Sequence, residues 1–194
     1  MITGIILASG LSRRMGSDKL LLPVDGIAIV ERVMQAADAS LLDDIIVVYQ
    51  NPMLRTLAER YRIRPIYNPD AALGQSASVK AGVLAALPET QAYMFLTGDQ
   101  PFISAPTINR LIVAWRAETL QILIPVYEGK RGSPVIFSSA CRPELLALEG
   151  DTGGRAITEQ APQMVRCINI PDANAGIDID TPVEYEHCTQ GRKS

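Results

Sequence analysis

A short segment near the N-terminus combines the residue types that bind polyphosphates. It begins where an apolar run at residues 5–7 ends, and such a run is typical of a buried strand. The small residues of the segment are Ala8, Ser9 and Gly10, and its cations are Arg13, Arg14 and Lys19. Small residues let backbone N–H groups approach an anion closely, and cationic side chains add charge that phosphates neutralise. We therefore expect this segment, together with Leu7 before it, to hold a nucleoside triphosphate.

Neither of two familiar phosphate-binding loops explains the segment. A P-loop needs a glycine, four residues and then Gly-Lys-Ser/Thr, and no such run occurs. The dinucleotide fingerprint needs three glycines at fixed offsets, which Gly10 and Gly16 do not supply. A surface loop with solvated cations is the plain alternative. The position directly after the first strand favours a binding site, because ligands on open α/β sheets bind beyond the carboxyl ends of strands.

The carboxylate of Asp99 is a second candidate. It follows an apolar strand expected at residues 92–96, so it lies at the same rim of the sheet as the first segment. A carboxylate there suits Mg²⁺, which usually takes one or two carboxylates together with phosphate oxygens and water. The alternative is an aspartate that merely ends the strand or stabilises the turn at Pro101.

Residues 177–180 alternate isoleucine with aspartate. In an extended segment this places Asp178 and Asp180 on one side. Two neighbouring carboxylates repel each other unless a cation or a helix N-terminus relieves them. We expect Asp180 to cap a helix that begins at Thr181 and Pro182, and Asp178 to contact metal or substrate.

Residues 68–82 follow an expected strand and open a helix of small residues. Gly74 allows close backbone approach, while Ser76 and Ser78 offer hydroxyls. The helix N-terminus would favour an anion or a polar ligand edge. A serine-capped helix that packs closely through alanine and glycine is the structural alternative. Two further segments, the cationic turn at residues 127–134 and the Asp-Thr-Gly-Gly-Arg run at 151–155, are explained by a hairpin tip and by helix capping, although the second would suit an anion.

Composition sets limits on the class of protein. The chain has 194 residues, enough for one α/β domain with a substantial core, which we expect to span residues 1–194 with a frayed tail after about His187. A formal net charge of -3 gives no general attraction to nucleic acid or an anionic membrane. The three cysteines are far apart and lack metal-binding spacing, as expected of thiols in a reducing cytoplasm. No apolar run reaches membrane-spanning length, so we expect a cytoplasmic protein.

Strand-like and helix-like segments alternate along the chain. We expect strands at residues 4–7, 44–49, 62–67, 92–96, 121–126, 133–137 and 164–170. Helices are expected at residues 29–39, 54–60, 76–87, 106–117, 142–148 and 154–160. This alternation predicts an α/β fold with a mostly parallel sheet covered on both faces. Residues 127–132 leave no room for a helix, so they predict a hairpin and an antiparallel element late in a mixed sheet.

The order of these motifs resembles the MobA-like nucleotidyltransferases, and among them the molybdenum cofactor cytidylyltransferases. The matching segments cover nearly the whole chain and are residues 7–10, 14–19, 74–78, 98–101, 131–135, 150–155 and 178–182. Each motif is weak alone, but five or six in order are specific. The resemblance implies a three-layer Rossmann-like nucleotidyltransferase fold with a late antiparallel hairpin.

The resemblance also implies roles for individual residues. The first segment would hold the triphosphate, with Arg14 and Lys19 as its cationic contacts. Gly74 and the neighbouring serines would hold base and ribose. Asp99 would bind Mg²⁺ and act with Arg14 and Lys19 in catalysis, and Asp178 would complete the metal or substrate site.

The implied reaction is Mg²⁺-dependent transfer of CMP from CTP to the phosphate of molybdopterin, with release of pyrophosphate. A recipient molybdoenzyme or its chaperone is a further implied partner. Ser9 departs from the family, because the cytidylyl branch usually has alanine there and the guanylyl branch glycine. We favour CTP over GTP, because a side chain at position 9 narrows the space for a purine. A guanylyltransferase, a sugar-phosphate nucleotidyltransferase and a nucleotide-binding regulator or cofactor carrier are the alternatives.

Overall fold

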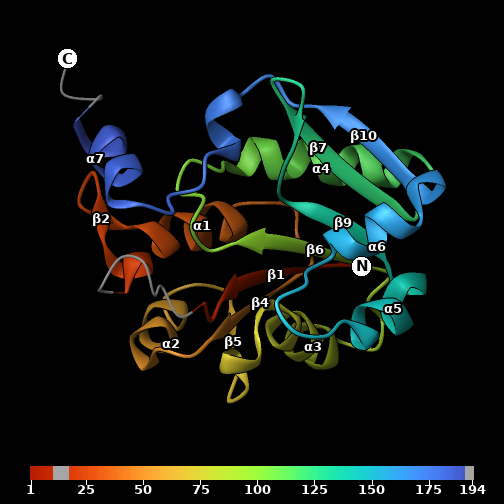
Figure 1. Cartoon of the computed structure of the whole chain (residues 1–194), viewed down its shortest axis with the longest axis horizontal. Coiled ribbons are helices and arrows are strands. Elements are labelled where there is room, and N and C mark those ends of the chain that lie inside the picture. The colour runs from red at the N-terminus through yellow and green to blue at the C-terminus, as the bar shows by residue number, and fades with distance from the viewer. Residues whose placement is uncertain (11–17, 191–194) are drawn as a thin grey trace.

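The computed structural model describes residues 1–10 and 18–190. Within this range the chain forms an α/β fold around an eight-stranded sheet in the order β10-β7-β9-β6-β1-β4-β5, with β8 paired to β7 outside this path (Figure 1). The strands are β1 (Ile2–Ala8), β4 (Asp44–Tyr49), β5 (Arg64–Tyr67), β6 (Ala92–Thr97), β7 (Ile122–Tyr127), β8 (Lys130–Arg131), β9 (Val135–Ser138) and β10 (Val165–Asn169). Strands β1, β4 and β6 are almost entirely buried.

The mixed character of the sheet is confirmed. Strands β5, β4, β1 and β6 run parallel, whereas β9 is antiparallel to both β6 and β7. The expected antiparallel pairing of β7 with β9 is present, and the link between them contains an additional strand, β8, which forms a tight hairpin with β7. Its two turn residues, Glu128 and Gly129, have φ angles of 47° and 81°, as a tight two-residue hairpin turn requires.

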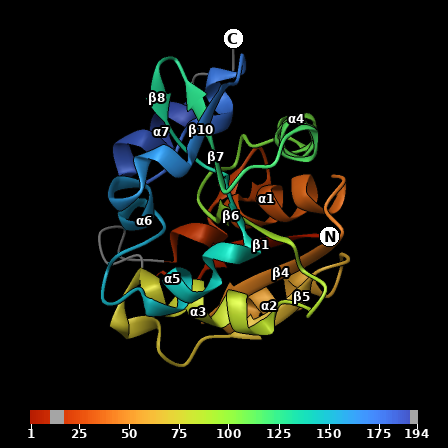
Figure 2. The ribbon, with the colours of Figure 1, turned by 90° about the vertical axis from the view of Figure 1, so that its right-hand side faces the viewer.

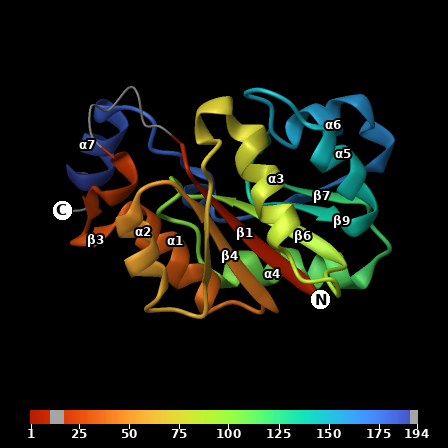
Figure 3. The same ribbon diagram turned by 90° about the horizontal axis from the view of Figure 1, so that it is seen from below.

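Helices cover the sheet on both faces, as Figures 2 and 3 show. They are α1 (Ile29–Asp38), α2 (Pro52–Ala58), α3 (Gln75–Ala85), α4 (Ala105–Ala117), α5 (Arg142–Ala147), α6 (Arg155–Gln160) and α7 (Pro182–Gln190). Short 3₁₀ helices are η1 (Lys19–Leu21), η2 (Ala71–Leu73), η3 (Ser139–Cys141), η4 (Pro162–Met164) and η5 (Ala173–Gly176). Side chains of α1, α2 and α4 pack with Ile6 on one face, and those of α3, α5 and α6 pack with Ile5 on the other. Successive strand residues point to opposite faces, so β1 supplies both cores.

Helix α3 approaches the sheet unusually closely. A Cβ atom at Gly82 would lie 2.4 Å from Cγ2 of Ile5 and 3.3 Å from Cγ2 of Val48. Glycine is therefore required where α3 crosses β1 and β4. This close packing brings the first turn of α3 beside the end of β1.

Two features differ from the sequence expectations. Strands β2 (Pro23–Val24) and β3 (Ile27–Ala28) form a small separate hairpin around Asp25 and Gly26, both with positive φ. Helix α7 continues to Gln190, three residues beyond His187, after which we expected the tail to fray. None of the described helices is both long and apolar enough to cross a membrane.

Candidate active site

A cleft of about 560 Å³ lies beyond the carboxyl ends of β1 and β6. Its lining includes seven residues expected from the sequence: Leu7, Ser9, Gly10, Lys19, Gly74, Ser78 and Asp99. Lining residues that sequence reasoning did not single out as site residues are Leu20, Ala71, Ala72, Leu73, Gln75, Thr97, Gly98, Asp151 and Asp180. The cleft therefore lies at the edge of the sheet where ligands of open α/β folds bind.

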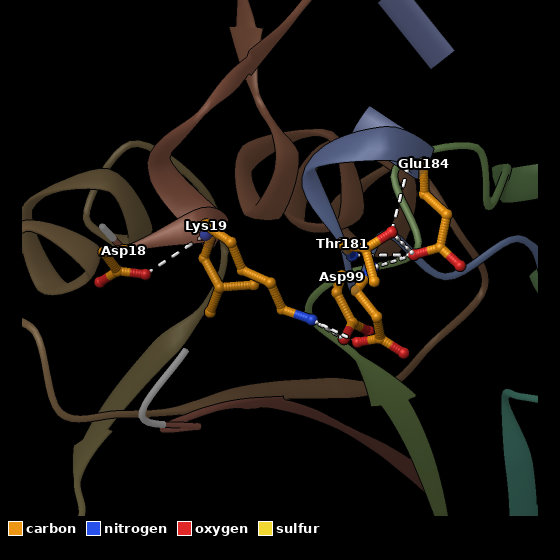
Figure 4. A network of polar contacts seen from close by, with 7 residues as sticks. Asp18, Lys19, Asp99, Thr181 and Glu184 are labelled. Carbon is orange, nitrogen blue, oxygen red and sulfur yellow. Dashed lines mark hydrogen bonds and ion pairs between the residues drawn. The ribbon is translucent and has the colours of Figure 1, made fainter. Parts of the chain in front are cut away.

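Lys19 stands at the centre of the polar end of the cleft (Figure 4). Asp18 caps the 3₁₀ helix η1 by accepting a hydrogen bond from the backbone N–H of Leu20, at 3.2 Å. Lys19 therefore leaves the first turn of η1 in a fixed direction. Its Nζ donates to Asp99 Oδ2 at 2.8 Å and to Asp180 Oδ1 at 2.7 Å.

The two carboxylates keep Lys19 charged. Burial alone lowers the pKa of Lys19, but the charges and hydrogen bonds of Asp99 and Asp180 outweigh burial and raise that pKa above its usual value. The Lys19 side chain is 13% exposed, so its ammonium group is only partly hydrated. A partly dehydrated cation held between two anions is suited to exchange them for phosphate oxygens.

Asp99 has one carboxylate oxygen in use and one free. The backbone N–H of Ile179 donates to the Asp99 carbonyl at 3.1 Å, which ties this turn to the segment before α7. Oδ2 accepts from Lys19, whereas Oδ1 is buried and has no hydrogen-bond partner among the described residues. A buried acceptor without a donor is costly, so Oδ1 fits a ligand that the protein alone does not supply. A divalent cation is such a ligand.

Asp178 does not line the cleft. It lies close enough to Asp99 for the two carboxylates to repel each other. Burial, followed by repulsion from Asp99, raises the pKa of Asp178 to about 6, although a hydrogen bond from Gln100 opposes the shift. Among the described residues no group of three or more His, Cys, Asp or Glu side chains forms a preassembled metal site. A cation here would therefore take few protein oxygens and complete its coordination with phosphates and water, as Mg²⁺ commonly does.

The expectation that Asp180 caps α7 is wrong. Thr181 is the cap: the backbone N–H of Glu184 donates to Thr181 Oγ1 at 3.3 Å, and Glu184 Oε2 accepts from the Thr181 N–H at 2.8 Å (Figure 4). This reciprocal pair is a capping box. Glu184 also accepts from the backbone N–H of Asp180, which leaves the Asp180 side chain free to reach Lys19.

Three buried polar side chains meet where the end of β1 contacts the first turn of α3. Ser9 follows β1, Ser78 lies on α3, and Asn68 follows β5. The Oγ atoms of Ser9 and Ser78 are 2.5 Å apart. Asn68 Nδ2 donates to both oxygens, at 3.2 Å and 3.3 Å. Asn68 was missed from the sequence, and its position directly after a strand is the signal that could have found it.

We expected the N-terminus of α3 to be open to a ligand, but residues 150–151 occupy its first backbone N–H groups. The backbone N–H of Gln75 donates to Asp151 Oδ1 at 3.2 Å, and that of Ser76 donates to the Gly150 carbonyl at 3.2 Å. Gly74 has φ 101°, and a Cβ there would lie 2.6 Å from the Gly150 oxygen. The close backbone approach at Gly74 is therefore to residues 150–151, although Gly74 still lines the cleft.

Two expected nucleotide-binding residues lie away from the cleft surface, and a third is not described. Ala8 and Ser76 are buried and do not line the cleft. Arg14 lies outside the described residues. Thr97, at the end of β6, lines the cleft, and its Oγ1 is buried without a partner among the described residues.

Comparison with known proteins assigns the chain to a family. Residues 4–165 match the MobA-like NTP transferase domain. The chain belongs to this family. Its members bind a nucleoside triphosphate, and the chain is a nucleotidyltransferase.

Three relatives of similar identity carry different names. The purine catabolism protein PucB of Bacillus subtilis is 32% identical and covers 95% of this chain and 94% of its own length. The nicotine blue oxidoreductase of Paenarthrobacter nicotinovorans is 31% identical, and the molybdenum cofactor cytidylyltransferase of Escherichia coli is 30% identical. Each of these two covers 93% of this chain and 92% of its own length. These relatives agree with membership of the MobA-like family, and their different names do not single out one nucleotide base or one acceptor for this chain.

Solved structures confirm the fold. Rv0371c from Mycobacterium tuberculosis has a TM-score of 0.85 at 24% identity, covering 97% of both chains. A manganese complex of the same protein has a TM-score of 0.78 at 22% identity, covering 97% of this chain and 98% of that one. The three-layer Rossmann-like architecture is therefore shared with these solved structures.

Proposed function

We propose that the protein transfers CMP from CTP to the phosphate of molybdopterin and releases pyrophosphate. The observation that carries this proposal is the meeting of Lys19 with Asp99 at the polar end of the cleft, where Asp99 keeps one buried oxygen free. A cation donor and an unsatisfied carboxylate side by side suit a triphosphate bound with a divalent metal.

Lys19 binds the triphosphate in this proposal. On nucleotide binding its ammonium group exchanges the carboxylates of Asp99 and Asp180 for phosphate oxygens and stabilises charge on the leaving pyrophosphate. Arg14 is proposed as the second cationic contact. Gly10 is proposed to contact the triphosphate, and Ser9, Gly74 and Ser78 also line the cleft and are proposed to lie beside base and ribose.

Mg²⁺ is the proposed metal, held by Asp99 with Asp178 completing the site. When bound, it would neutralise charge on the phosphates and the leaving pyrophosphate. The donor set fits, because the free oxygen of Asp99 lacks a partner and the charges of Asp99 and Asp178 repel each other.

The chemistry needs no general base. A phosphate oxygen of molybdopterin attacks the α-phosphorus of CTP, the new P–O bond forms, and the bond to the β-phosphate bridging oxygen breaks. The attacking phosphate has a second pKa near 6, so it is already ionised at neutral pH. Positioning and charge neutralisation supply most of the catalysis of such transfers.

CTP is favoured over GTP because of Ser9, whose side chain narrows the cleft. The serine is 2% exposed and is held by Ser78 and Asn68, so it cannot swing away to admit a larger base. The likeness to the cytidylyltransferase of Escherichia coli over 93% of the chain supports the same choice. Guanylyltransferases also match, including one from Cupriavidus metallidurans at 29% identity.

Pyrophosphate release is the direct test. The purified protein is incubated with Mg²⁺, molybdopterin and each of CTP, GTP, ATP and UTP. We expect release with CTP that requires molybdopterin. Release with GTP only would identify a guanylyltransferase, and tight nucleotide binding without release would support a regulator or carrier.

A further inference from the structure

The Ser9, Ser78 and Asn68 side chains form a closed hydrogen-bond network whose donors and acceptors can be assigned. The backbone N–H of Asp70 donates to Asn68 Oδ1 at 3.1 Å, which fixes the orientation of the Asn68 amide. The amide nitrogen must then face the two serines, to which it can only donate. Each serine oxygen is therefore an acceptor toward Asn68.

Two hydroxyl protons remain to be placed. One lies between the serine oxygens, which are 2.5 Å apart. The other cannot point at Asn68, because that nitrogen carries no free lone pair. No described residue accepts it, yet Ser9 and Ser78 are 2% and 6% exposed and both line the cleft. Since a buried hydroxyl donor is rarely left unpaired, the second proton must point into the cleft toward a ligand.

The ligand atom at this end belongs to a nucleoside. Lys19, Asp99 and Asp180 contact one another at the polar end of the cleft, and the remaining charged lining residue, Asp151, accepts a hydrogen bond from the backbone N–H of Gln75. Near the serines, the wall of the cleft includes the uncharged residues Ala71–Leu73 of η2, which packs against α3. Phosphates are favoured at the first end and a base at the second.

We propose that Asn68 is a positioning residue that makes the base end of the cleft a hydrogen-bond donor. By donating to both Ser9 and Ser78, it directs one hydroxyl proton toward an acceptor atom of the base, a ring carbonyl oxygen or an unprotonated ring nitrogen. Asn68 does not line the cleft and acts only through the serines. The inference rests on the proposed function for the identity of the ligand as CTP.

Asn68→Asp tests the inference by reversing the polarity with almost no change in shape. An aspartate oxygen accepts where the amide donated, so one serine donates to Asp, the other donates to the first, and no proton remains for the cleft. We expect the affinity for CTP, measured by calorimetry, to fall about five- to tenfold. Inorganic tripolyphosphate, which has phosphates but no base, is the control ligand for the CTP measurement.

The charge of the new aspartate is controlled in a second background. In Ser9→Ala/Ser78→Ala protein, which has no hydroxyl proton to redirect, Asn68→Asp should cause no further loss of CTP affinity. A loss of the same size in this background would show that charge alone weakens binding and would overturn the inference. So would an Asn68→Asp effect as large for tripolyphosphate as for CTP.

The serine variants test the same point should Asn68→Asp fail to fold. Each single alanine variant still leaves one hydroxyl that accepts from Asn68 and donates into the cleft. The double variant leaves none. We therefore expect the double variant to lose more CTP affinity than the product of the two single losses, with tripolyphosphate affinity unchanged. Multiplicative losses, or no loss, would contradict the proton assignment.

The failure of this inference is distinguishable from failure of the proposed function. If wild type binds another nucleoside triphosphate in place of CTP, the proposed base is wrong and the same variants are compared with that nucleotide. If CTP binds and is turned over equally well in every variant, only the role of Asn68 is wrong. If no nucleoside triphosphate binds, both are overturned.

Discussion

The Lys19 ammonium group joins two carboxylates that come from distant parts of the chain. Asp99 follows β6 and Asp180 precedes α7, and both lie within 2.8 Å of Lys19 Nζ. The positions of Lys19 and Asp99 in the cleft were predictable, because each follows an apolar strand or a small-residue loop. The position of Asp180 was not, because its sequence equally suits a helix cap and only the fold shows that Thr181 takes that place.

Asp99→Asn should abolish most turnover without unfolding the protein. The amide keeps the volume of the carboxylate but carries no negative charge and so holds a divalent cation more weakly, and we expect a loss of at least about a hundredfold in kcat. Pyrophosphate release at saturating Mg²⁺ measures it, and the melting temperature should change little. Glu89→Gln, an exposed isosteric change before β6, is the control and should retain activity. Near-normal turnover of Asp99→Asn would refute the metal assignment.

Lys19→Ala should weaken the binding of CTP more than the binding of CMP. A hydrogen bond to a charged group contributes about 1.5–3 kcal/mol, so a loss of tenfold or more is expected for the triphosphate. Equilibrium binding of the two nucleotides measures the difference, and Lys130→Ala on the exposed β8 strand is the control. Equal losses for CTP and CMP would mean that Lys19 does not contact the β- and γ-phosphates.

At the scale of the elements, short connections position the site. The mostly parallel sheet and its late antiparallel element were predicted from apolar runs and from a link too short for a helix, whereas the strand order was not predicted. The β2–β3 hairpin was missed although Asp25-Gly26 is a typical two-residue turn, because its strands are only two residues long. The contact of Asp151 with the first turn of α3 joins residues 76 positions apart, so no local pattern could predict it.

The capping box of α7 should make stability depend on pH. Hydrogen bonds from the backbone of Asp180, then from Thr181, lower the pKa of Glu184. A lowered acid pKa stabilises the fold above the unfolded-state value, and the stabilisation disappears as the pH falls through the folded-state value. Glu184→Gln keeps a capping amide but loses the charge, so its melting temperature should be roughly 1–2 °C lower at neutral pH.

The difference should vanish in acid, where Glu184 is protonated in wild type as well. Melting curves of both proteins between neutral and acidic pH measure it. Glu186→Gln on the same helix is the control and should follow wild type throughout. A difference between Glu184→Gln and wild type that persists unchanged in acid would contradict the role of the charge.

At the scale of the whole molecule, the two cores on either side of the sheet hold the strand ends in register. Ile5 and Ile6 of β1 are both fully buried, one in each core, so β1 contributes side chains to both cores. The close crossing of α3 over β1 depends on Gly82, and the sequence shows the glycine but not the side chain opposite it. Packing across the sheet is the part of the fold that composition and periodicity do not determine.

Gly82→Ala should therefore destabilise the protein. Alanine is favoured over glycine in a helix by about 1 kcal/mol, but its Cβ would meet the buried Ile5, and overpacking costs about 1–3 kcal/mol. With a Cβ contact of 2.4 Å the steric cost should win, and the melting temperature should fall. Leu84→Ala, at a position 64% exposed, is the control and should change it little. A more stable Gly82→Ala protein would show that α3 can shift freely.

The ratio of kcat/KM for CTP and GTP, with molybdopterin as acceptor and pyrophosphate release as the readout, tests the central claim most directly. The account predicts a higher kcat/KM for CTP, a strict requirement for molybdopterin and a collapse of the rate in Asp99→Asn. A higher kcat/KM for GTP, or no pyrophosphate release with any nucleotide in the presence of Mg²⁺ and molybdopterin, would contradict it.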